Sequence, residues 1–374
     1  MKTKVAYLDY SLHFAGAESA LHTIISHLDR ERFEPIIVFP FPCEHHHRYD
    51  DLECEKIYLS DGIKWWMGSD RWKKPIRGTD FIKRTILGYR LAKVLSSKDI
   101  KILHVNLLRP DSLMWIWSCC KFGIKIVGHL RSLSMEWVPS SGVQKRCDAI
   151  ISVSGIVREH AMSVFQHSNN RVIFDSISFS REVGFEQNNE KNIISSVAVL
   201  APHKGHDHAI MAFDAIAAKY PDYELHIVGG GMEQSYELKR LKAIASATSC
   251  PERIKFTEKQ VSNVEKYYSQ SKLVLSLTKQ GEAFGLVPFE AALCGKPTIA
   301  PNKGAVTELL EDGISGIFVD TLDVDAIADR IDWALSNYDV CREISSKTLN
   351  VIEERLRPEI MANQIMGVYS QLLK

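Results

Sequence analysis

The sequence of 374 residues lacks any long uninterrupted apolar run. A helix that crosses a bilayer needs roughly 18 such residues, so the sequence predicts no transmembrane helix. The amino-terminal segment carries two lysines and an apolar stretch that imitate a signal peptide, but Asp9 and His13 interrupt that stretch. We therefore expect that the chain is not exported.

The sequence also lacks net charge, because 46 Lys and Arg residues face 46 Asp and Glu residues. An overall field that attracts nucleic acid needs an excess of basic residues, so we expect no nucleic-acid partner, although a local basic patch stays open. The eight cysteines are scattered, without a C-x-x-C pair. This distribution predicts reduced thiols in a cytoplasmic protein rather than a disulfide framework.

What the sequence does have is a regular alternation of short apolar runs with amphipathic stretches. Alternation of this kind predicts parallel sheets that helices cover on both faces. The predicted helices include Glu18–Leu28, Phe81–Leu95 and Pro358–Leu373. The predicted strands are Lys4–Leu8, Pro35–Pro40, Ile102–Asn106, Ile124–His129, Ala149–Val153, Arg171–Ile173, Ile193–Leu200, Glu224–Val228, Ile254–Thr257, Leu273–Leu277, Pro297–Ala300 and Gly316–Val319.

A polar segment, residues 181–192, separates two such series and is typical of a linker. The predicted fold class is α/β, with two doubly wound Rossmann-like domains that face an interdomain cleft. We expect the first domain over residues 1–180, the second over 181–357, and a closing helix over 358–374 that packs back on the first domain. Because ligands bind at the carboxyl ends of parallel strands, the cleft is the expected site.

A glycine-containing loop follows the predicted strand Leu273–Leu277 and leads into a short helix. Pro288 near the start of this helix and Gly295 just beyond its end follow the usual preferences of helix termini. Backbone N–H groups at such a turn bind anions, and the carboxylates of Glu282 and Glu290 accept strong hydrogen bonds from sugar hydroxyls. The loop therefore predicts a site for a phosphorylated sugar. A helix cap beside a solvated glutamate is the alternative that these residues leave open.

The two glutamates, with AFGLVPF between them, resemble the signature of the retaining nucleotide-sugar glycosyltransferases of family 4, the group 1 glycosyltransferases. These enzymes have the two-domain GT-B fold. The resemblance extends over nearly the whole chain and is strongest over residues 193–320. The segments that carry it are Ala15–Leu21, Asn192–Asp207, Leu225–Gly231, Glu282–Glu290 and Asn302–Val319.

The resemblance implies roles for residues of the second domain. Glu282 would bind the hydroxyls of the transferred sugar, and Glu290 would bind the ribose of the nucleotide. Lys204 would neutralise the leaving diphosphate, and Thr257 would lie near the base. Backbone amides would assist Glu282 or approach the phosphates. The residues implied for these amides are Ala283, Phe284, Gly285, Leu286 and Val287.

Three residues of the first domain are implied as well. Gly16, at the first strand–helix turn, would let the backbone approach the donor diphosphate or the acceptor. His129 would contact the donor sugar, and Arg131 would bind the donor beside it. With Glu282 and Lys204, His129 completes the expected catalytic set. A plain tight turn and a structural histidine are the alternatives.

The chain departs from the family at one position of the diphosphate site. The family usually has an arginine five residues before the lysine, where this sequence has Val199. A leaving diphosphate requires positive charge, so half of the expected clamp is missing. Arg131 and His203 are the candidates that could replace it.

The implied reaction moves a hexose or N-acetylhexosamine from a nucleotide-diphosphate sugar to a glycan or polyprenyl-diphosphate-linked acceptor, with retention. A UDP-sugar is the first expectation and a GDP-sugar the second, in bacterial lipopolysaccharide, O-antigen or capsule synthesis. No cofactor and no metal are expected. The His45–His47 run could bind a metal, but we interpret it as a polar loop beside Glu44 and Arg48. The alternatives are a sugar-nucleotide epimerase, a two-lobed sugar-binding protein and a degenerate transferase.

The stretch 64–93 combines nine basic residues with Trp65, Trp66 and Trp72. Basic residues interleaved with tryptophan suit an anionic lipid surface, so we expect peripheral docking on the inner face of the membrane. A solvated basic loop with tryptophans in the core is the alternative. Single-stranded nucleic acid could also use such a patch, but the rest of the chain offers no nucleic-acid motif.

Overall fold

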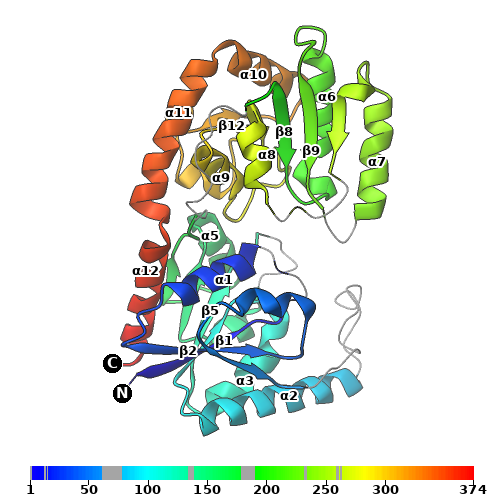
Figure 1. The fold of residues 1–374 in the computed structure, drawn as a ribbon. Helices are drawn as coiled ribbons and strands as arrows, with labels where there is room; N and C mark the ends of the chain where they lie inside the picture. Colours follow the sequence, from blue (N-terminus) through cyan, green and yellow to red (C-terminus); the bar gives the residue numbers. More distant parts are fainter. Residues whose placement is uncertain are drawn as a thin grey trace. The chain divides into compact units, whose positions relative to one another are not determined.

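The chain divides into two compact units (Figure 1). The structure is a computed structural model and describes residues 2–11, 14, 16–60, 78–133, 139–177, 190–230, 234–257, 261 and 263–374. The first unit comprises Met1–Ser176 and Pro358–Lys374, and the second comprises Ile177–Arg357. The division thus lies between residues 176 and 177 rather than between 180 and 181, and most of the predicted linker lies outside the described residues.

The described part of the first unit contains a seven-stranded parallel sheet in the order β3-β2-β1-β4-β5-β6-β7. Its central strands are almost completely buried, as expected for a parallel sheet covered on both faces. The strands are β1 (Thr3–Leu8), β2 (Phe33–Phe39), β3 (Glu55–Tyr58), β4 (Ile102–Val105), β5 (Lys125–Leu130), β6 (Ala149–Ser152) and β7 (Asn170–Val172).

The sequence does not predict β3, which lies at the edge of this sheet beside β2. This strand has only four residues, and two of them are the charged Glu55 and Lys56. Charged residues are typical of edge strands, because they discourage pairing with another chain. A search for apolar runs therefore misses β3 for a physical reason.

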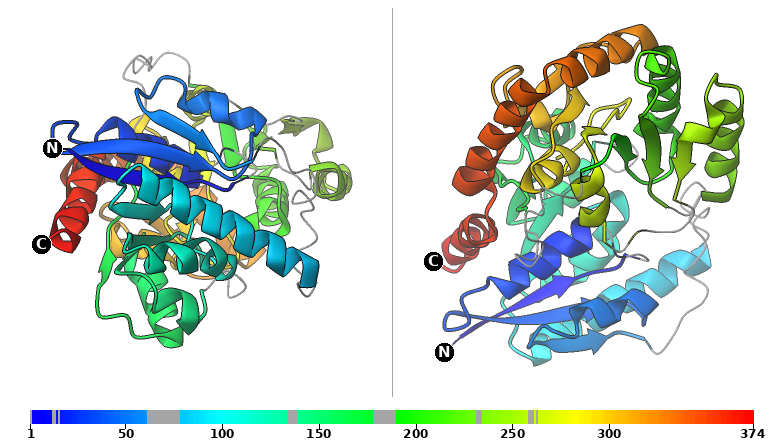
Figure 2. Two further views of the ribbon diagram at one scale, coloured as in Figure 1. Left: turned by 90° about the horizontal axis from the view of Figure 1, so that it is seen from below. Right: turned by 45° about the horizontal axis from the view of Figure 1, so that its top comes forward.

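The helices of the first unit include the last helix of the chain. In α12, Met361, Ile365 and Tyr369 belong to the same buried apolar cluster as Tyr7 and Leu21. Figure 2 shows this helix, in red, beside the blue strands of the amino terminus. The helices are α1 (Gly16–Ser26), α2 (Gly78–Ser97), α3 (Leu113–Lys121), α4 (Ser141–Gln144), α5 (Gly155–Val164) and α12 (Pro358–Leu372).

In its described residues, the second unit contains a six-stranded parallel sheet in the order β10-β9-β8-β11-β12-β13. Each of these strands overlaps a strand that the sequence predicts. They are β8 (Ile193–Val197), β9 (Glu224–Val228), β10 (Ile254–Phe256), β11 (Leu273–Leu275), β12 (Thr298–Pro301) and β13 (Ile317–Val319). The helices around the sheet are α6 (His206–Ile216), α7 (Gln234–Ser246), α8 (Glu265–Gln270), α9 (Val287–Leu293), α10 (Val324–Ser336) and α11 (Tyr338–Val351).

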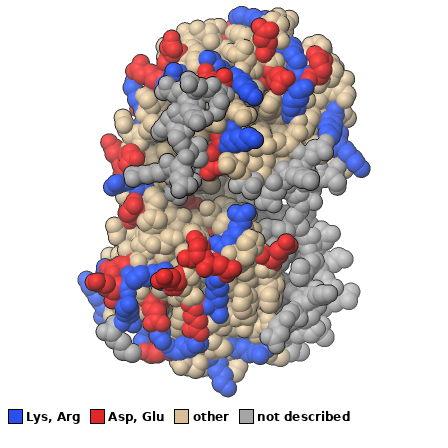
Figure 3. Space-filling model, viewed as in Figure 1, with Lys and Arg blue, Asp and Glu red and all other residues tan. Residues whose placement is uncertain are grey.

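Three global features of the structure bear on the sequence analysis. None of the helices in the described residues is both long enough and apolar enough to cross a membrane. All eight cysteines are described, and each is a free thiol. On the face shown in Figure 3, acidic and basic side chains of the described residues are interspersed on both units, in keeping with the zero net charge.

Candidate active site

The loops after β8 and β11 bring two predicted catalytic residues together in the second unit. Lys204 is the last residue of the short helix η7 (Pro202–Lys204), and Glu282 lies between β11 and α9. Lys204 Nζ donates to Glu282 Oε1 at 2.7 Å, and the two side chains are 20% and 23% exposed. The pair is therefore partly shielded from water but remains accessible to a ligand.

Two glycines allow the loops around this pair to approach closely. Gly205 has a φ of 75°, and a Cβ there would lie 2.0 Å from the carbonyl oxygen of Leu277. Gly304 has a φ of 82°, and a Cβ there would lie 2.7 Å from the backbone nitrogen of Glu282. Since a side chain at either position would collide with backbone, glycine is required for Lys204 and Glu282 to meet in this arrangement.

The rest of the predicted donor loop connects Glu282 to α9. Phe284 is buried and stacks on Phe289 of α9, with ring centroids 5.8 Å apart, which anchors the loop on the helix. Gly285 lies directly beside the Glu282 side chain. The half-exposed residues of the loop are Ala283, Leu286 and Val287. The use of their backbone amides by phosphates stays a prediction.

The second glutamate of the motif, Glu290, lies on α9 and is bound by a tyrosine. The Tyr268 hydroxyl of α8 donates to Glu290 Oε2 at 2.8 Å. Burial raises the pKa of Glu290, the Tyr268 hydrogen bond lowers it, and the charges of Glu265 and Glu282 raise it. The sequence offers no signal for Tyr268, because this partner comes from a separate helix.

Thr257 directly follows β10 and contacts the glycine-containing end of β9. Its Oγ1 accepts from the Gly229 N–H at 2.8 Å and lies 3.2 Å from the Gly229 carbonyl oxygen. The threonine therefore holds the loop after β9 against the end of β10. Its predicted place near a nucleotide base is not tested by this contact.

No cationic side chain occupies position 199, and Val199 is 53% exposed. The structure instead shows two lysines near the donor loop that the sequence analysis missed. Lys279 Nζ binds Asp207 Oδ2 at 2.8 Å, and Lys303 Nζ donates to the Lys279 carbonyl oxygen at 2.6 Å. Lys279 lies two residues before Gly281, so its position beside the motif was an available signal, whereas Lys303 follows β12 and has no such signal.

His129, the third predicted catalytic residue, lies in β5 of the first unit and is completely buried. Its Nδ1 lies 3.1 Å from an Arg131 amino nitrogen and 3.2 Å from His104 Nε2. His104 Nδ1 in turn lies 2.6 Å from the Tyr369 hydroxyl of α12, which lies 3.3 Å from the Tyr7 hydroxyl. A polar chain thus runs through the core from α12 to His129.

The contact with Arg131 assigns the ring proton of His129. Because a guanidinium can only donate, His129 Nδ1 must accept, and the ring proton is on Nε2. That Nε2 is buried and has no hydrogen-bond partner within the part of the chain that the structure describes. Burial, followed by the charge of Arg131, lowers the pKa of His104 to about 3 and that of His129 well below its usual value. Both rings are therefore neutral.

Arg131 follows β5 and is almost fully enclosed, with a side chain that is 4% exposed. Its guanidinium forms an ion pair with Asp175 and donates to the Asn106 carbonyl oxygen at 3.1 Å. These contacts make Arg131 a residue that holds His129 in the first unit. Its predicted contact with a donor, and its predicted replacement of the missing arginine, stay untested.

Gly16 is the exposed first residue of α1. Two buried carboxylates, those of Asp9 and Glu18, lie near this turn. Asp9 accepts from the Tyr49 hydroxyl at 2.8 Å, and the Ser11 hydroxyl donates to Glu18. Burial and the nearby charge of Glu18 raise the pKa of Asp9 to about 6. In the sequence, Asp9 is recognisable only as an interruption of an apolar run, and no local signal predicts its pairing with Glu18.

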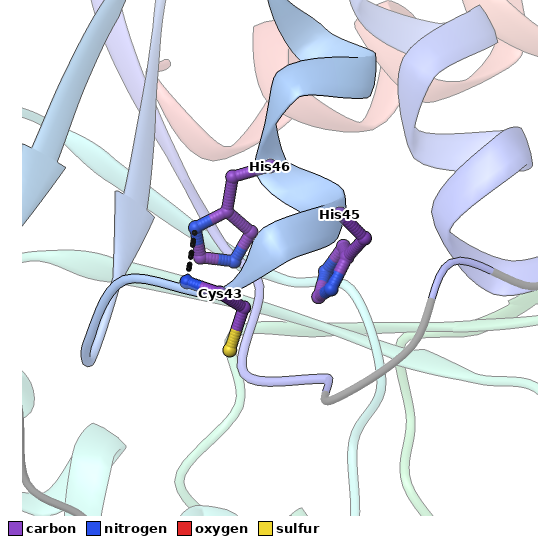
Figure 4. A group of neighbouring side chains, drawn as sticks. All are labelled: Cys43, His45 and His46. Atoms are coloured by element: carbon purple, nitrogen blue, oxygen red, sulfur yellow. Dashed lines mark hydrogen bonds between the residues drawn. The ribbon is translucent and has the colours of Figure 1, made fainter.

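Two further predictions from the sequence concern the first unit, the basic stretch and the His45–His47 run. Residues 64–77 of the basic, tryptophan-rich stretch lie outside the described residues. The interpretation of His45–His47 as a polar loop is wrong. These residues belong to the helix η1 (Glu44–Tyr49), where His46 is 5% exposed and stacks on Phe39 with ring centroids 3.6 Å apart (Figure 4).

Comparisons with known proteins bear on the family and the fold of the chain. Residues 180–351 match the family model described as Glycosyl transferases group 1. The N-acetyl-alpha-D-glucosaminyl L-malate synthase of Bacillus anthracis is 25% identical over 77% of this chain and 79% of the relative. A GDP-mannose-dependent alpha-(1-6)-phosphatidylinositol monomannoside mannosyltransferase of Mycolicibacterium smegmatis is 30% identical over 38% of each chain.

Among solved structures, Anabaena Alr3699/HepE in complex with UDP and glucose matches with a TM-score of 0.79. The match has 18% identity and covers 98% of this chain and 99% of the other. Residues 180–351, nearly all of the second unit, thus belong to the group 1 glycosyltransferases, and the chain has the GT-B fold. The recognition of the group 1 glycosyltransferases, over residues 180–351, and of the GT-B fold from the sequence is confirmed, and the names of the relatives support transferase activity.

Proposed function

We propose that the chain transfers a hexose or N-acetylhexosamine from a nucleotide-diphosphate sugar to a hydroxyl of a glycan or lipid-linked acceptor. The contact between Lys204 and Glu282 carries the proposal, because it holds a cation and a carboxylate together beside the donor loop. In the complex, Lys204 turns to the leaving diphosphate. Glu282 is then free to accept hydrogen bonds from the sugar hydroxyls.

The proposed transfer retains the configuration at the anomeric carbon. The bond from this carbon to the diphosphate oxygen breaks, the bond to the acceptor oxygen forms on the same face, and the diphosphate takes the acceptor's proton. Glu282 and Glu290 bind the donor and are not the acid and nucleophile of a two-carboxylate glycosidase. The buried Nε2–H of His129 supports a contact with a sugar hydroxyl, since it has no partner among the described residues. No metal or cofactor takes part.

UDP is the first candidate for the donor nucleotide, and GDP is the second. The likeness to a structure that contains UDP and glucose supports the first, and the name of the mannosyltransferase relative supports the second. A thermal-shift panel of UDP, GDP, ADP, TDP and CMP tests this choice, since a ligand of the native state raises its apparent stability. We expect a clear shift with UDP. No shift with any diphosphate contradicts the proposed donor site.

An epimerase or a sugar-binding protein on the same fold is the alternative. Release of the nucleotide only in the presence of an acceptor distinguishes a transferase from both. We expect release from the UDP-sugar to require the acceptor and to persist after treatment with EDTA. Acceptor-independent conversion of the sugar nucleotide contradicts transfer, and complete loss with EDTA contradicts a metal-independent reaction.

The described end of the basic stretch supports a lipid-linked acceptor in surface-glycan synthesis. On α2, Ile86 and Tyr89 are 53% and 55% exposed, and Tyr89 contacts the exposed Phe122 edge-on. On α3, the exposed Trp117 lies under the Lys121 ammonium at 5.2 Å. Exposed aromatic residues beside basic ones suit the headgroup region of an anionic membrane at the cytoplasmic face.

Cosedimentation with anionic vesicles at low salt tests this docking surface. We expect the wild type to sediment with vesicles that contain phosphatidylglycerol but not with neutral vesicles. Tyr89→Ser should weaken the association severalfold. Tyr236→Ser, which changes a still more exposed tyrosine on α7 of the second unit, should not. Wild-type protein that stays in the supernatant, or equal effects of the two variants, contradicts docking through this surface.

A further inference from the structure

We propose that Lys303 supplies the positive charge that the diphosphate site lacks at Val199. This rests on the proposed function, in which Lys204 turns to the leaving diphosphate. Two phosphate groups carry more than one negative charge, so a single lysine offsets only part of the charge that develops in the transition state. Lys303 is the second cation, and its ligand is the diphosphate of the nucleotide-sugar donor.

Lys303 lies in a segment that is bound directly to the donor loop. It follows β12, and two residues later the Ala305 N–H donates to the Glu282 carbonyl oxygen at 3.0 Å. The Lys303 side chain lies beside Gly281, because a Cβ on that glycine would be 3.8 Å from Lys303 Cγ. The stem of the lysine therefore begins next to the residue that precedes Glu282.

The ammonium of Lys303 is linked to the loop that contains Lys204. Lys303 Nζ donates to the Lys279 carbonyl oxygen at 2.6 Å, and the Lys279 N–H donates to the His203 carbonyl oxygen at 2.7 Å. His203 directly precedes Lys204. The strands β8, β11 and β12, which lead into these loops, are parallel neighbours, so their carboxyl ends meet at one edge of the sheet. Both lysines thus belong to the edge that carries the donor loop.

The charge of Lys303 is not offset by a carboxylate within the part of the chain that the structure describes. Its hydrogen bond to a carbonyl oxygen leaves two N–H groups of the ammonium for an anion. When the donor binds, Lys204 gives up a carboxylate, whereas Lys303 gives up only a carbonyl oxygen. Three other basic side chains near the donor loop are already paired with carboxylates, namely Lys204 with Glu282, Lys279 with Asp207, and Arg240 with Asp207 and Glu237.

The two residues that the sequence suggests for this charge are less suitable. Arg131 is paired with Asp175, and its side chain is 4% exposed. A histidine such as His203 is positively charged only when it is protonated. Lys303 is exposed, and a lysine ammonium on its flexible stem binds phosphate as a point charge. It can therefore turn from the Lys279 carbonyl oxygen to an anion by a change of rotamer.

Nucleotide titration of the full chain tests this role. Lys303→Met should weaken UDP binding at least about tenfold, with little change in the affinity for uridine, which has no phosphate. Lys303→Arg keeps the charge and should retain most of the affinity. The matched control is Lys255→Met on β10, because Lys255 is also exposed and donates to a carbonyl oxygen, that of Glu252, at 2.6 Å. This control should bind UDP like the wild type.

The arginine that the family usually has at position 199 supplies a second readout. Val199→Arg, added to Lys303→Met, should restore most of the UDP affinity, because the guanidinium replaces the lost charge in the loop that contains Lys204. Loss of a merely structural contact at Lys303 would not be rescued from position 199. Thermal melting checks that each variant is folded, and if Lys303→Met is not, Lys303→Gln decides.

The outcomes distinguish this inference from the proposed function. If Lys204→Met weakens UDP binding and Lys303→Met does not, the inference is overturned while the donor site stands. If Lys303→Met weakens the binding of UDP and uridine equally, the lysine only holds the loop, and the inference is again overturned. If the wild type binds none of UDP, GDP, ADP and TDP, the inference and the proposed donor site fail together.

Discussion

Lys204 Nζ lies 2.7 Å from Glu282 Oε1, although the two residues are 78 positions apart in the sequence. They meet because β8 and β11 are neighbours in the second sheet and run parallel. The segments that follow the carboxyl ends of neighbouring parallel strands come together at one edge of the sheet. In the absence of a donor, the carboxylate offsets the charge of the lysine that is proposed to bind the diphosphate.

Substitution of the two partners should change nucleotide affinity in opposite directions. Glu282→Gln removes the negative charge beside Lys204, so UDP should bind severalfold more tightly, whereas Lys204→Met should weaken UDP binding at least about tenfold. Turnover should fall by roughly tenfold to a hundredfold in both variants, equivalent to about 1.4–2.7 kcal/mol of barrier. Calorimetric titration with UDP and assays of nucleotide release measure the two effects.

The matched controls are Glu343→Gln and Lys347→Met, which alter a solvent-exposed Lys–Glu pair on α11. Both controls should keep wild-type affinity and turnover, because an exposed pair contributes little. Near-normal rates in Glu282→Gln and Lys204→Met together would remove the proposed site.

The close approach at Gly304 makes a separate prediction about the donor loop. Gly304→Ala and Gly313→Ala both place alanine at a positive φ, but only the Cβ at 304 collides with backbone, that of Glu282. Gly304→Ala should therefore displace the loop and reduce turnover at least about tenfold, whereas Gly313→Ala should cost only about 1 kcal/mol of stability. Thermal denaturation and the turnover assay separate the two effects. Equal turnover in the two variants would show that the loop tolerates the displacement.

Loss of the contact between Tyr268 and Glu290 should change the pH dependence of kcat/KM for the donor. The Tyr268 hydrogen bond lowers the pKa of the buried Glu290 carboxyl, so Tyr268→Phe should raise that pKa. If the ionised carboxylate binds the ribose, the acid limb of kcat/KM should move to higher pH. The control is Tyr267→Phe at the adjacent position of α8. An acid limb at the same pH in all three proteins argues against a ribose contact by ionised Glu290.

Buried neutral His104 should make the protein sensitive to acid. Its pKa in the folded state is about 3, below the value of about 6.5 in an unfolded chain. The unfolded chain therefore binds more protons between these values, and the stability from this group is lost as pH falls below about 6.5, at up to about 1.4 kcal/mol per pH unit.

His104→Gln cannot be protonated in this range, so its stability should fall less steeply with acid. The variant should be less stable than the wild type at pH 7, because the hydrogen bond with Tyr369 is altered, and the deficit should shrink by pH 5. Melting temperatures at both pH values measure this. The exposed His47→Gln is the control, and a deficit that stays constant with pH would contradict a neutral buried His104.

The sequence by itself determined the kinds of element and the position of the loop that is proposed to bind the donor. Alternation of apolar runs predicts parallel sheets because every central strand must be buried on both faces. The Glu282–Glu290 motif predicts a donor loop because glycines and carboxylates serve that chemistry locally. These features depend on residues close together in the chain, and a single sequence displays such relationships directly.

The tertiary structure decided which distant residues act as partners. The order of strands in each sheet joins Lys204 to Glu282, and the return of α12 to the first unit joins Tyr369 to His104, 265 positions away. It also placed His129 in the core rather than on the surface. Local pattern carries no record of these pairings, because a buried polar group needs a partner but its residue type does not specify which part of the chain supplies it.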